Sequence, residues 1–434
     1  MTDTINPYLV ARNHYFFAIV FFLGISLLIT IKTTVDFDVL FFQLLTILLS
    51  TLFFVCSLKK NTSKYFFYTS LIYGCLLVGL FHLFGFLDLP PDGYNYMMDA
   101  ETAAMRPGGI IEENLKFVDA VGSSAHIDDL GYMIICTAAH RIFGLEGGEL
   151  FLELFKVLIH AFSCQILFKL CKKYLTTEKN SAIITSLWAF NTYIGYFATS
   201  KLKEPVFAFV ILSAVYYMYK VIDRKTVINA VIFATWTAVS FLFRAVAPIY
   251  FIAAFIICKY FQRFLKTKTI TLGIIFSIIL VAFGSNIFIR HFSSAAGMIM
   301  DRLEEYQEIA TQILNIVNVF VAPYPAFSTK NQEVSLYTAQ YAIINSAFSV
   351  FVFLGMFRAI KYEIKCMYPL MIVLMINSLM LIITGFSMNP RYTYITVFLA
   401  YAFIPIGFYY VKKKGLIITF MLFLGVVTYM YNLR

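Results

Sequence analysis

Long hydrophobic runs separated by short polar stretches make up most of this chain. A bilayer with a hydrocarbon core of about 30 Å is crossed by a helix of about 20 mainly apolar residues. Thirteen runs come close to that length, so the pattern predicts a multi-span, all-helical membrane protein. The predicted spans cover residues 14–32, 38–57, 65–86, 150–171, 181–200, 205–221, 226–243, 246–264, 270–289, 338–357, 367–386, 392–411 and 415–431.

Basic residues gather at the ends of these runs, in alternate loops. Cytoplasmic loops of membrane proteins carry an excess of Lys and Arg, and this bias sets the orientation. The clusters therefore place the N-terminus inside and the C-terminus outside. Their members are Lys59, Lys60, Lys64, Lys172, Lys173, Lys179, Arg224, Lys225, Lys259, Arg263, Lys266, Lys268, Arg358, Lys361, Lys365, Lys412, Lys413 and Lys414.

The apolar stretch Leu130–Leu145 fits this alternation only if it does not cross the membrane. It is short, contains His140 and Arg141, and ends in the breaker-rich segment 144–148. Counting it as a span would place the cluster at Lys172 outside and invert every later cluster. We therefore expect a helix that lies in the outer interface or dips into it.

Composition supports the membrane class. Hydrophobic residues make up 60% of the 434 positions and charged residues 13%, which excludes an ordinary soluble domain. The net charge of +10 comes from residues that end the spans, so it indicates orientation rather than nucleic-acid binding. The seven cysteines include no CxxC pair, so neither a disulfide framework nor a zinc site is indicated.

The expected organisation is a single all-α integral membrane domain over residues 1–434. Two long outward loops separate three groups of spans. The first loop, residues 87–149, holds the interface helix, and the second, residues 290–338, holds a predicted surface helix over 295–320. The spans then fall within residues 1–86, 150–289 and 339–434.

The first candidate residue for chemistry is Asp92, which follows the paired prolines after the third predicted span. Proline ends the helix and places this carboxylate at the outer membrane surface. There it stays ionised at little cost and is suited to act as a general base or a metal ligand. The alternative is a turn residue, because Pro-Asp-Gly is a common turn sequence.

The second candidate segment is a short outward turn with Lys201, Lys203, Glu204 and Pro205. Its two lysines break the charge rule for outward loops, and a lysine pair beside a glutamate suits a phosphate or metal neighbourhood. The alternative for Glu204 is structural, since an acid stabilises the positive N-terminal end of a helix.

Two arginines stand near the outer ends of spans. Arg244 lies between two spans, and Arg391 precedes Tyr392 at the start of a late span. An arginine against hydrocarbon is costly, so each is expected to face a polar cavity or an anionic partner. The alternative is that each reaches the lipid headgroups.

Four other polar residues have simpler interpretations. Asp128 and Asp129 precede the interface helix and are expected to cap its N-terminus. His82 and His160 are expected to be hydrogen-bonded within the helix bundle rather than to bind a ligand.

The order of these motifs resembles the GT-C superfamily of polyprenol-dependent membrane glycosyltransferases. The matching parts are Asp92, Tyr96 and Ala100 outside a span, the stretch from Gly131-Tyr132 to Phe143-Gly144, the Lys-Glu-Pro turn within 190–219, and Arg391-Tyr392. The chain is also similar to O-antigen and capsular repeat-unit polymerases. It departs from the family in having one Asp where members have an adjacent acidic pair.

The resemblance implies a helical bundle whose active site opens to the outer leaflet. A sugar or oligosaccharide would pass, with inversion, from a polyprenyl phosphate or diphosphate carrier to a growing surface glycan. Asp92 and Glu204 would be the catalytic carboxylates and the ligands of a divalent metal, Mg or Mn. The carrier and its phosphate would be bound by Lys201, Lys203, Arg244, Arg391, Tyr96 and Tyr392.

The expected location is the bacterial inner (plasma) membrane, with the site on the periplasmic or extracellular face. A transporter or flippase of lipid-linked glycans, without transferase activity, is the alternative. Transporters carry polar sites at mid-bilayer and paired repeats. Here the ionisable residues are mostly at the outer mouth, which favours the transferase.

Overall fold

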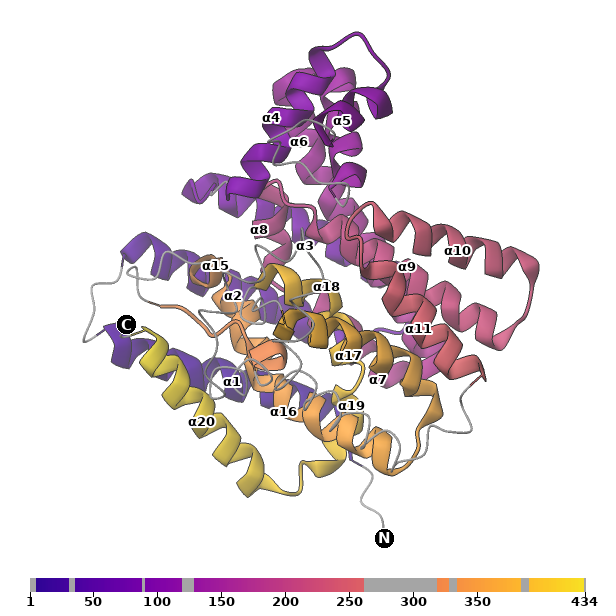
Figure 1. The fold of residues 1–434 in the computed structure, drawn as a ribbon. Helices are drawn as coiled ribbons and strands as arrows, with labels where there is room; N and C mark the ends of the chain where they lie inside the picture. The colour runs from indigo at the N-terminus through magenta and orange to yellow at the C-terminus, as the bar shows by residue number, and fades with distance from the viewer. Residues whose placement is uncertain are drawn as a thin grey trace. The chain divides into compact units, whose positions relative to one another are not determined.

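The computed structural model describes residues 5–30, 36–87, 90–118, 129–260, 318–327, 334–383 and 390–432. All elements in these ranges are helices (Figure 1). The predicted span 270–289 and nearly all of the predicted surface helix 295–320 lie outside the described residues, as does Asp128.

Among the described residues, eight helices are long and apolar enough to cross a membrane. The broken pair formed by residues 391–401 and 404–410, bent by 55°, would make a ninth, and two shorter apolar helices cover 227–241 and 247–260. The prediction of an all-helical membrane protein is thereby confirmed in its coarse form. The count of thirteen spans stays a prediction.

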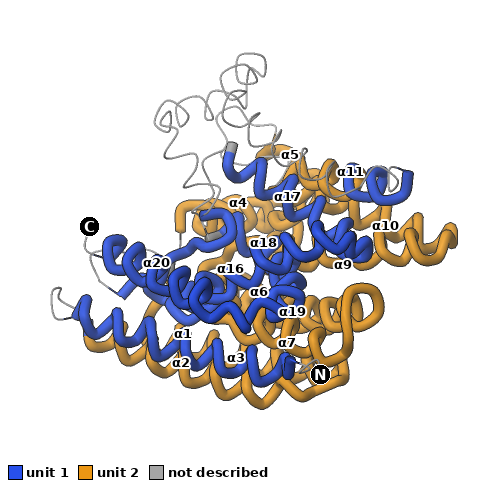
Figure 2. Tube along the Cα trace, turned by 90° about the horizontal axis from the view of Figure 1, so that it is seen from below, with its two compact units in different colours: residues 1–36, 253–434 blue, residues 37–252 orange. Residues whose placement is uncertain are grey.

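The contacts of the chain group into two compact units (Figure 2). Unit 1 comprises residues 1–36 and 253–434, and unit 2 comprises residues 37–252. The sequence predicts one continuous domain, and that prediction stays open.

Unit 2 is organised around one long helix, α6, which contacts six neighbouring helices. These elements are α2 (Phe37–Ser57), α3 (Ser63–Phe84), α4 (Pro91–Met105), α5 (Ile110–Val118), α6 (Leu130–Leu170), the π-helical turn η1 (Cys171–Leu175), α7 (Glu178–Ala189), α8 (Tyr193–Thr199), α9 (Glu204–Asp223), α10 (Val227–Phe241) and the first part of α11 (Ala247–Tyr260). α6 packs on α3, α4, α5, α7, α8 and α9, and therefore positions every element of the site described below.

α6 is two helices joined at Gly144. Its 41 residues would extend roughly 60 Å if straight, about twice the hydrocarbon thickness of a bilayer. The backbone leaves helical geometry at Gly144, with φ 75° and ψ 179°, a left-handed conformation that glycine adopts without a Cβ penalty. The break falls where the sequence predicts the end of an interface helix and the start of a span.

The predicted span 181–200 is interrupted. α7 ends at Ala189 and α8 begins at Tyr193. The Asn191 side chain holds the break: its Nδ2 donates to the Trp188 carbonyl, and its Oδ1 accepts from the Tyr193 amide at 3.0 Å. Hydropathy is insensitive to such a break because the flanking residues are apolar on both sides.

Unit 1 is built on α16, which packs on α1, α19 and α20. Its elements are α1 (Pro7–Thr30), the end of α11, α15 (Val334–Tyr337), α16 (Ala339–Lys361), the 3₁₀ turn η4 (Lys365–Met367), α17 (Tyr368–Ile383), α18 (Pro390–Tyr401), α19 (Ile404–Gly407), the 3₁₀ turn η5 (Phe408–Tyr410) and α20 (Lys414–Asn432). α16 and α19 approach closely at glycines: a Cβ on Gly355 would clash with the Phe403 backbone, and one on Gly407 with the Phe351 backbone. Small residues allow such close helix contacts in membranes.

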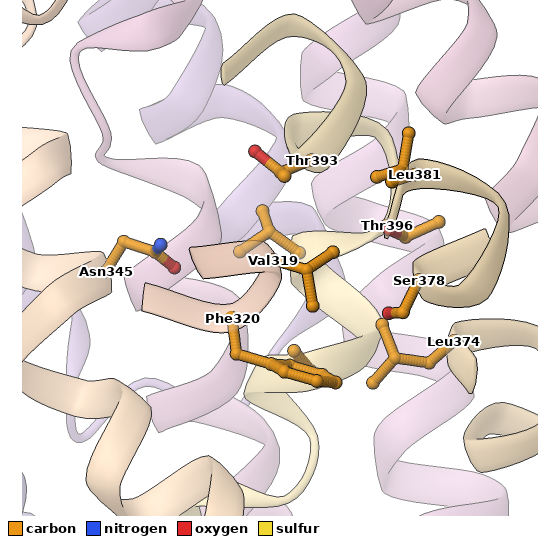
Figure 3. A pocket seen from close by; sticks show the side chains of 10 residues that line it. Val319, Phe320, Asn345, Leu374, Ser378, Leu381, Thr393 and Thr396 are labelled. Carbon is orange, nitrogen blue, oxygen red and sulfur yellow. The ribbon is translucent and has the colours of Figure 1, made fainter. Parts of the chain in front are cut away.

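A small cavity lies inside unit 1, beside α16, α17 and α18 (Figure 3). Its volume is about 10 Å³, which is room for about one water molecule. The wall includes the polar side chains of Asn345, Ser378, Thr393 and Thr396 among apolar ones. This cavity is too small for a sugar or a phosphate group.

Candidate functional site

The candidate site lies in unit 2, around the turn formed by residues 200–204, here called the lysine turn. α8 ends at Thr199, and Glu204 begins α9 with Pro205 directly behind it. Lys201, Lys203 and Glu204 are all buried. Lys201 has a φ of 58°, and a non-glycine residue in this region costs about 1–3 kcal/mol. The surrounding contacts hold this strained turn in place.

Ionisable residues on α6 face the lysine turn. Glu149, Glu153, Lys156 and His160 follow one another at spacings of four, three and four, which places them on one side of the helix. Glu149 is at the exposed end, with 44% of its side chain accessible, whereas Glu153, Lys156 and His160 are buried. The row therefore runs from the surface of unit 2 into its interior.

Lys201 is held by two of these carboxylates. Its Nζ donates to Glu153 Oε1 at 2.6 Å and lies 3.2 Å from Glu149 Oε2. The other oxygen of Glu153 lies 2.8 Å from Nε2 of His82, on α3. His82 thus has the hydrogen-bonded role that the sequence predicts, with a carboxylate as its partner.

Lys203 forms a second buried pair, with Asp129. Its Nζ also donates to the Phe243 carbonyl at 2.9 Å, and the Tyr96 hydroxyl donates to the same carboxylate at 2.7 Å. One carboxylate therefore joins α4, the start of α6 and the lysine turn. Asp129 is the residue preceding α6, but its side chain makes no capping hydrogen bond there, so the predicted capping role is wrong for this residue.

The segment that carries Asp92 packs on the lysine turn. Asp92 is half-buried in the first turn of α4, which starts after Pro90 and has Pro91 at its first position. The following residue, Gly93, packs directly on the lysine turn: a Cβ there would clash with the Ser200 carbonyl oxygen. The first-loop motif and the Lys-Glu-Pro motif, more than 100 residues apart in the sequence, therefore meet in space.

Lys156 and His160 bond to backbone carbonyls at the ends of α7 and α8. Lys156 Nζ donates to the Phe197 carbonyl at 3.2 Å, and His160 Nε2 lies 3.2 Å from the Ala189 carbonyl. Helix C-termini leave carbonyls without intrahelical partners, and within a membrane these must be satisfied by the protein. Both side chains therefore stabilise the interrupted α7–α8 segment.

The predicted arginines have separate environments. Arg244, in the turn between α10 and α11, is half-buried, with its guanidinium 5.6 Å from the Phe207 ring centre and beside the Tyr250 hydroxyl. Arg391 and Tyr392 belong to unit 1, at the start of α18, where the guanidinium lies 5.8 Å from the Tyr392 ring centre. Arg244 lies close to the lysine turn, because Lys203 bonds to the carbonyl of the preceding residue, Phe243, and Phe207 is in the first turn of α9. Nothing places Arg391 relative to that turn.

Two carboxylates outside the spans have shifted pKa values. The Lys116 hydrogen bond, at 2.7 Å, lowers the pKa of Glu113 on α5, with Arg106 adding to the effect. Partial burial raises the pKa of Asp99, which lies two helical turns beyond Asp92 on α4. The two shifts have opposite signs because only Glu113 has cations beside it.

A divalent metal needs several oxygen or nitrogen ligands. Within the described ranges, no three His, Cys, Asp or Glu side chains are grouped so that they could hold an ion. The two lysines of the turn are paired with Glu149, Glu153 and Asp129.

Sequence reasoning identified Asp92, Tyr96, Lys201, Lys203 and Glu204, and the structure brings the segments that carry them together. It did not assign a role to Glu149, Glu153 or Lys156. For Glu153 and Lys156, which lie on the predicted span 150–171, the available signal was that ionisable residues inside spans mark functional sites.

Comparison of the chain with models of known protein families, with curated proteins and with solved structures finds no match.

Proposed function

We propose that this protein is an inverting membrane glycosyltransferase that uses a polyprenyl phosphate or diphosphate donor. It would transfer a sugar or an oligosaccharide to a growing surface glycan, with a repeat-unit polymerase such as one for O-antigen as a subtype. The observation that carries the proposal is the packing of Gly93, the residue after Asp92, on Ser200 of the lysine turn. This packing brings the segment of Asp92 to the turn that carries Lys201 and Lys203, and it supports the proposal that the carboxylate and the lysines act together.

The proposed reaction uses these groups as follows. The acceptor hydroxyl oxygen attacks the anomeric carbon, and the bond between that carbon and the phosphate oxygen breaks. The bonding electrons leave with the phosphate, whose growing negative charge is stabilised by fixed cations. Asp92 accepts the hydroxyl proton as general base. Glu204 is the second carboxylate, and Tyr96 and Arg244 complete the donor-binding region.

Phosphate binding requires an exchange of partners at the lysine turn. Lys201 is bonded to buried Glu153 and to Glu149, whose side chain is partly accessible. We infer that the donor phosphate takes the place of Glu149. The Glu149 side chain can rotate outward and be solvated by water, so this exchange leaves no unpaired carboxylate in the interior. Lys203, bonded to buried Asp129, would keep its partner and hold the turn.

The proposal includes a topology. Thirteen spans, a cytoplasmic N-terminus and a site on the outer face of the bacterial inner membrane follow from the alternation of basic clusters. Arg391 and Tyr392 are proposed as additional donor contacts. Mg or Mn bound by Asp92 and Glu204 belongs to the proposal, and no step above depends on it.

A flippase for lipid-linked glycans is the second candidate. It is favoured by the interrupted α7–α8 segment, because transporters build their substrate sites from discontinuous helices. The two activities differ in product. Purified protein in liposomes would be given a fluorescent polyprenyl-phosphate-linked sugar and a glycan acceptor. A transferase releases polyprenyl phosphate, whereas a flippase moves the intact lipid between leaflets, and release of no carrier phosphate would exclude the transferase.

A further inference from the structure

A group of lysines and tyrosines lies where the chain leaving α6 meets the end of α9. The ring of Tyr174, in η1, is stacked on that of Tyr219, with 5.5 Å between the ring centres, and lies 6.3 Å from that of Tyr216. Lys173 Nζ donates to the Tyr174 hydroxyl at 2.8 Å. These contacts join two segments of unit 2 that are distant in the sequence.

The π-helical turn η1 shapes one side of this group. Such turns are rare in proteins and occur frequently at functional sites. Within η1, Cys171 and Leu175 are buried, whereas Lys172 and Lys173 are exposed and Tyr174 is half-buried. The turn therefore keeps two side chains in the core and presents the lysines and the tyrosine at the surface.

Lys220 reaches the same region from α9. Its Nζ lies 4.7 Å from the ring centre of Tyr216 and 4.4 Å from that of Tyr217. An aromatic face attracts an ammonium group electrostatically and is not a hydrogen-bond acceptor of the ordinary kind, so the three N–H donors stay available to a ligand. Lys169 and Lys173 are close enough for their charges to act on Lys220. The basic patch is defined as Lys169, Lys173, Tyr174, Tyr216, Tyr217 and Lys220.

Carboxylates neutralise only part of the positive charge at the patch. The segments 169–179 and 220–225 contain seven basic residues and two acidic ones. Glu178 lies 3.1 Å from Lys172, outside the patch, and Asp223 lies 3.9 Å from the patch lysine in η1. Within the described ranges, the other two patch lysines have no carboxylate within 4 Å. An anion from outside the chain is therefore attracted to this surface.

The patch and the lysine turn lie at opposite ends of α9. The rise of the helix puts Lys220 about 24 Å beyond Glu204, close to the hydrocarbon thickness of about 30 Å. In the proposed topology the lysine turn is at the outer face, so the patch is at the cytoplasmic face. Tyrosine side chains are enriched at the level of the lipid headgroups, and lysine side chains reach that level from the end of a span. The composition of the patch thus suits a membrane surface.

We propose that the basic patch binds the phosphate of an anionic phospholipid in the cytoplasmic leaflet. The ammonium groups of the patch lysines donate to the phosphate oxygens, and the tyrosine rings contact the first methylene groups of the acyl chains. A lipid is favoured over a soluble anion because the cations lie at the ends of apolar helices and are combined with aromatic side chains. The site is separate from the lysine turn and does not depend on glycosyl transfer.

Native mass spectrometry of the purified full-length protein, titrated with phosphatidylglycerol, tests this site. We expect Lys173→Gln/Lys220→Gln to weaken the tightest lipid-binding step by about 30-fold, the factor that two lysines near a membrane surface contribute. Both side chains reach solvent, so the core does not depend on them. The matched control is Lys59→Gln/Lys60→Gln, which removes the same charge from an exposed turn at the same predicted face. It should bind the lipid as the wild type does.

A second variant separates a built site from general charge attraction. Tyr217→Leu keeps every charge and removes one aromatic face beside Lys220, so it should weaken binding about two- to fivefold. Zwitterionic phosphatidylcholine should bind the wild type more weakly than phosphatidylglycerol, and excess inorganic phosphate should not displace the lipid. Equal affinity for the two lipids, displacement by inorganic phosphate, equal losses in the patch and control variants, or unchanged binding in Tyr217→Leu would each overturn the proposal. The two lipid comparisons use the wild type, so they remain decisive if a variant does not fold.

Discussion

At the scale of single residues, the site is a set of buried ion pairs. Lys201 is bonded to Glu153, and Lys203 to Asp129, with all four side chains largely inaccessible. A buried pair adds little net stability, yet removing one partner leaves an uncompensated charge in the interior. Such pairs therefore indicate that the four side chains have a defined geometry. They are not evidence of a large contribution to folding stability.

The pair of Lys203 and Asp129 allows a direct test of this arrangement. Lys203→Met should destabilise the protein by about 3–5 kcal/mol, because it leaves Asp129 charged and buried. The double variant Lys203→Met/Asp129→Asn should recover most of that loss. Unfolding of each variant in detergent, followed by circular dichroism, measures both. If the two single losses simply add in the double variant, the pair does not exist.

Part of this residue pattern could be predicted from the sequence. Asp92, Lys201, Lys203 and Glu204 are conspicuous because they are polar residues at the ends of hydrophobic runs. Their partners are not conspicuous, because they are distant in the sequence: Glu153 is 48 residues from Lys201, and Asp129 is 74 residues from Lys203. Local sequence does not encode which carboxylate meets which lysine, because the packing of α4, α6 and α9 decides it.

At the scale of elements, breaks in helices position the site. The kink at Gly144 separates the two halves of α6, so that Asp129 and Glu153, on different halves, both meet the lysine turn. The end of α7 presents the Ala189 carbonyl to His160, and the end of α8 presents the Phe197 carbonyl to Lys156. The first break was predicted from the glycine-rich segment 144–148, whereas the second was not, because Asn191 lies in an apolar run.

The backbone conformation at the kink favours glycine at position 144. Gly144→Ala should destabilise the protein by about 1–2 kcal/mol, because alanine is strained at this positive φ although no neighbour lies within 4 Å. Gly24→Ala, in the middle of α1 and equally free of neighbours, is the matched control. It should be neutral or stabilising by up to about 1 kcal/mol. Thermal unfolding of both variants checks this, and equal stability of the two would contradict the strain.

Helix positions were the most predictable feature of the elements. The predicted ranges 38–57, 65–86 and 205–221 coincide within a few residues with α2, α3 and α9. They were predictable because length and hydropathy are local properties. Short elements such as α5 and α8 were not predicted, since they depend on packing against α6.

At the scale of the whole molecule, orientation is the main open prediction. Charge alternation places Lys365 and its neighbours inside and the start of α4 outside. The two compact units each contain helices long enough to cross a membrane. The grouping into units was not predicted, because it depends on contacts between segments distant in the chain.

Thiol labelling of intact cells tests this orientation. Cys366 is exposed next to Lys365, and Tyr94, on α4, is 54% accessible. In a variant freed of the other native cysteines, a membrane-impermeant maleimide should label Tyr94→Cys and leave Cys366 unlabelled until the membrane is permeabilised. Labelling of Cys366 in intact cells would invert the proposed topology and place the lysine turn on the wrong face.

The most direct test of the account is the release of polyprenyl phosphate or diphosphate by the purified protein and by its Asp92→Asn variant. Both would be reconstituted with a polyprenyl-linked sugar donor and an acceptor glycan. The account predicts release by the wild type and a loss of at least about 100-fold in the variant, the size expected for a general base. Folding of the variant is checked by its unfolding temperature. Equal release by the two proteins, or release by neither, would contradict the central claim.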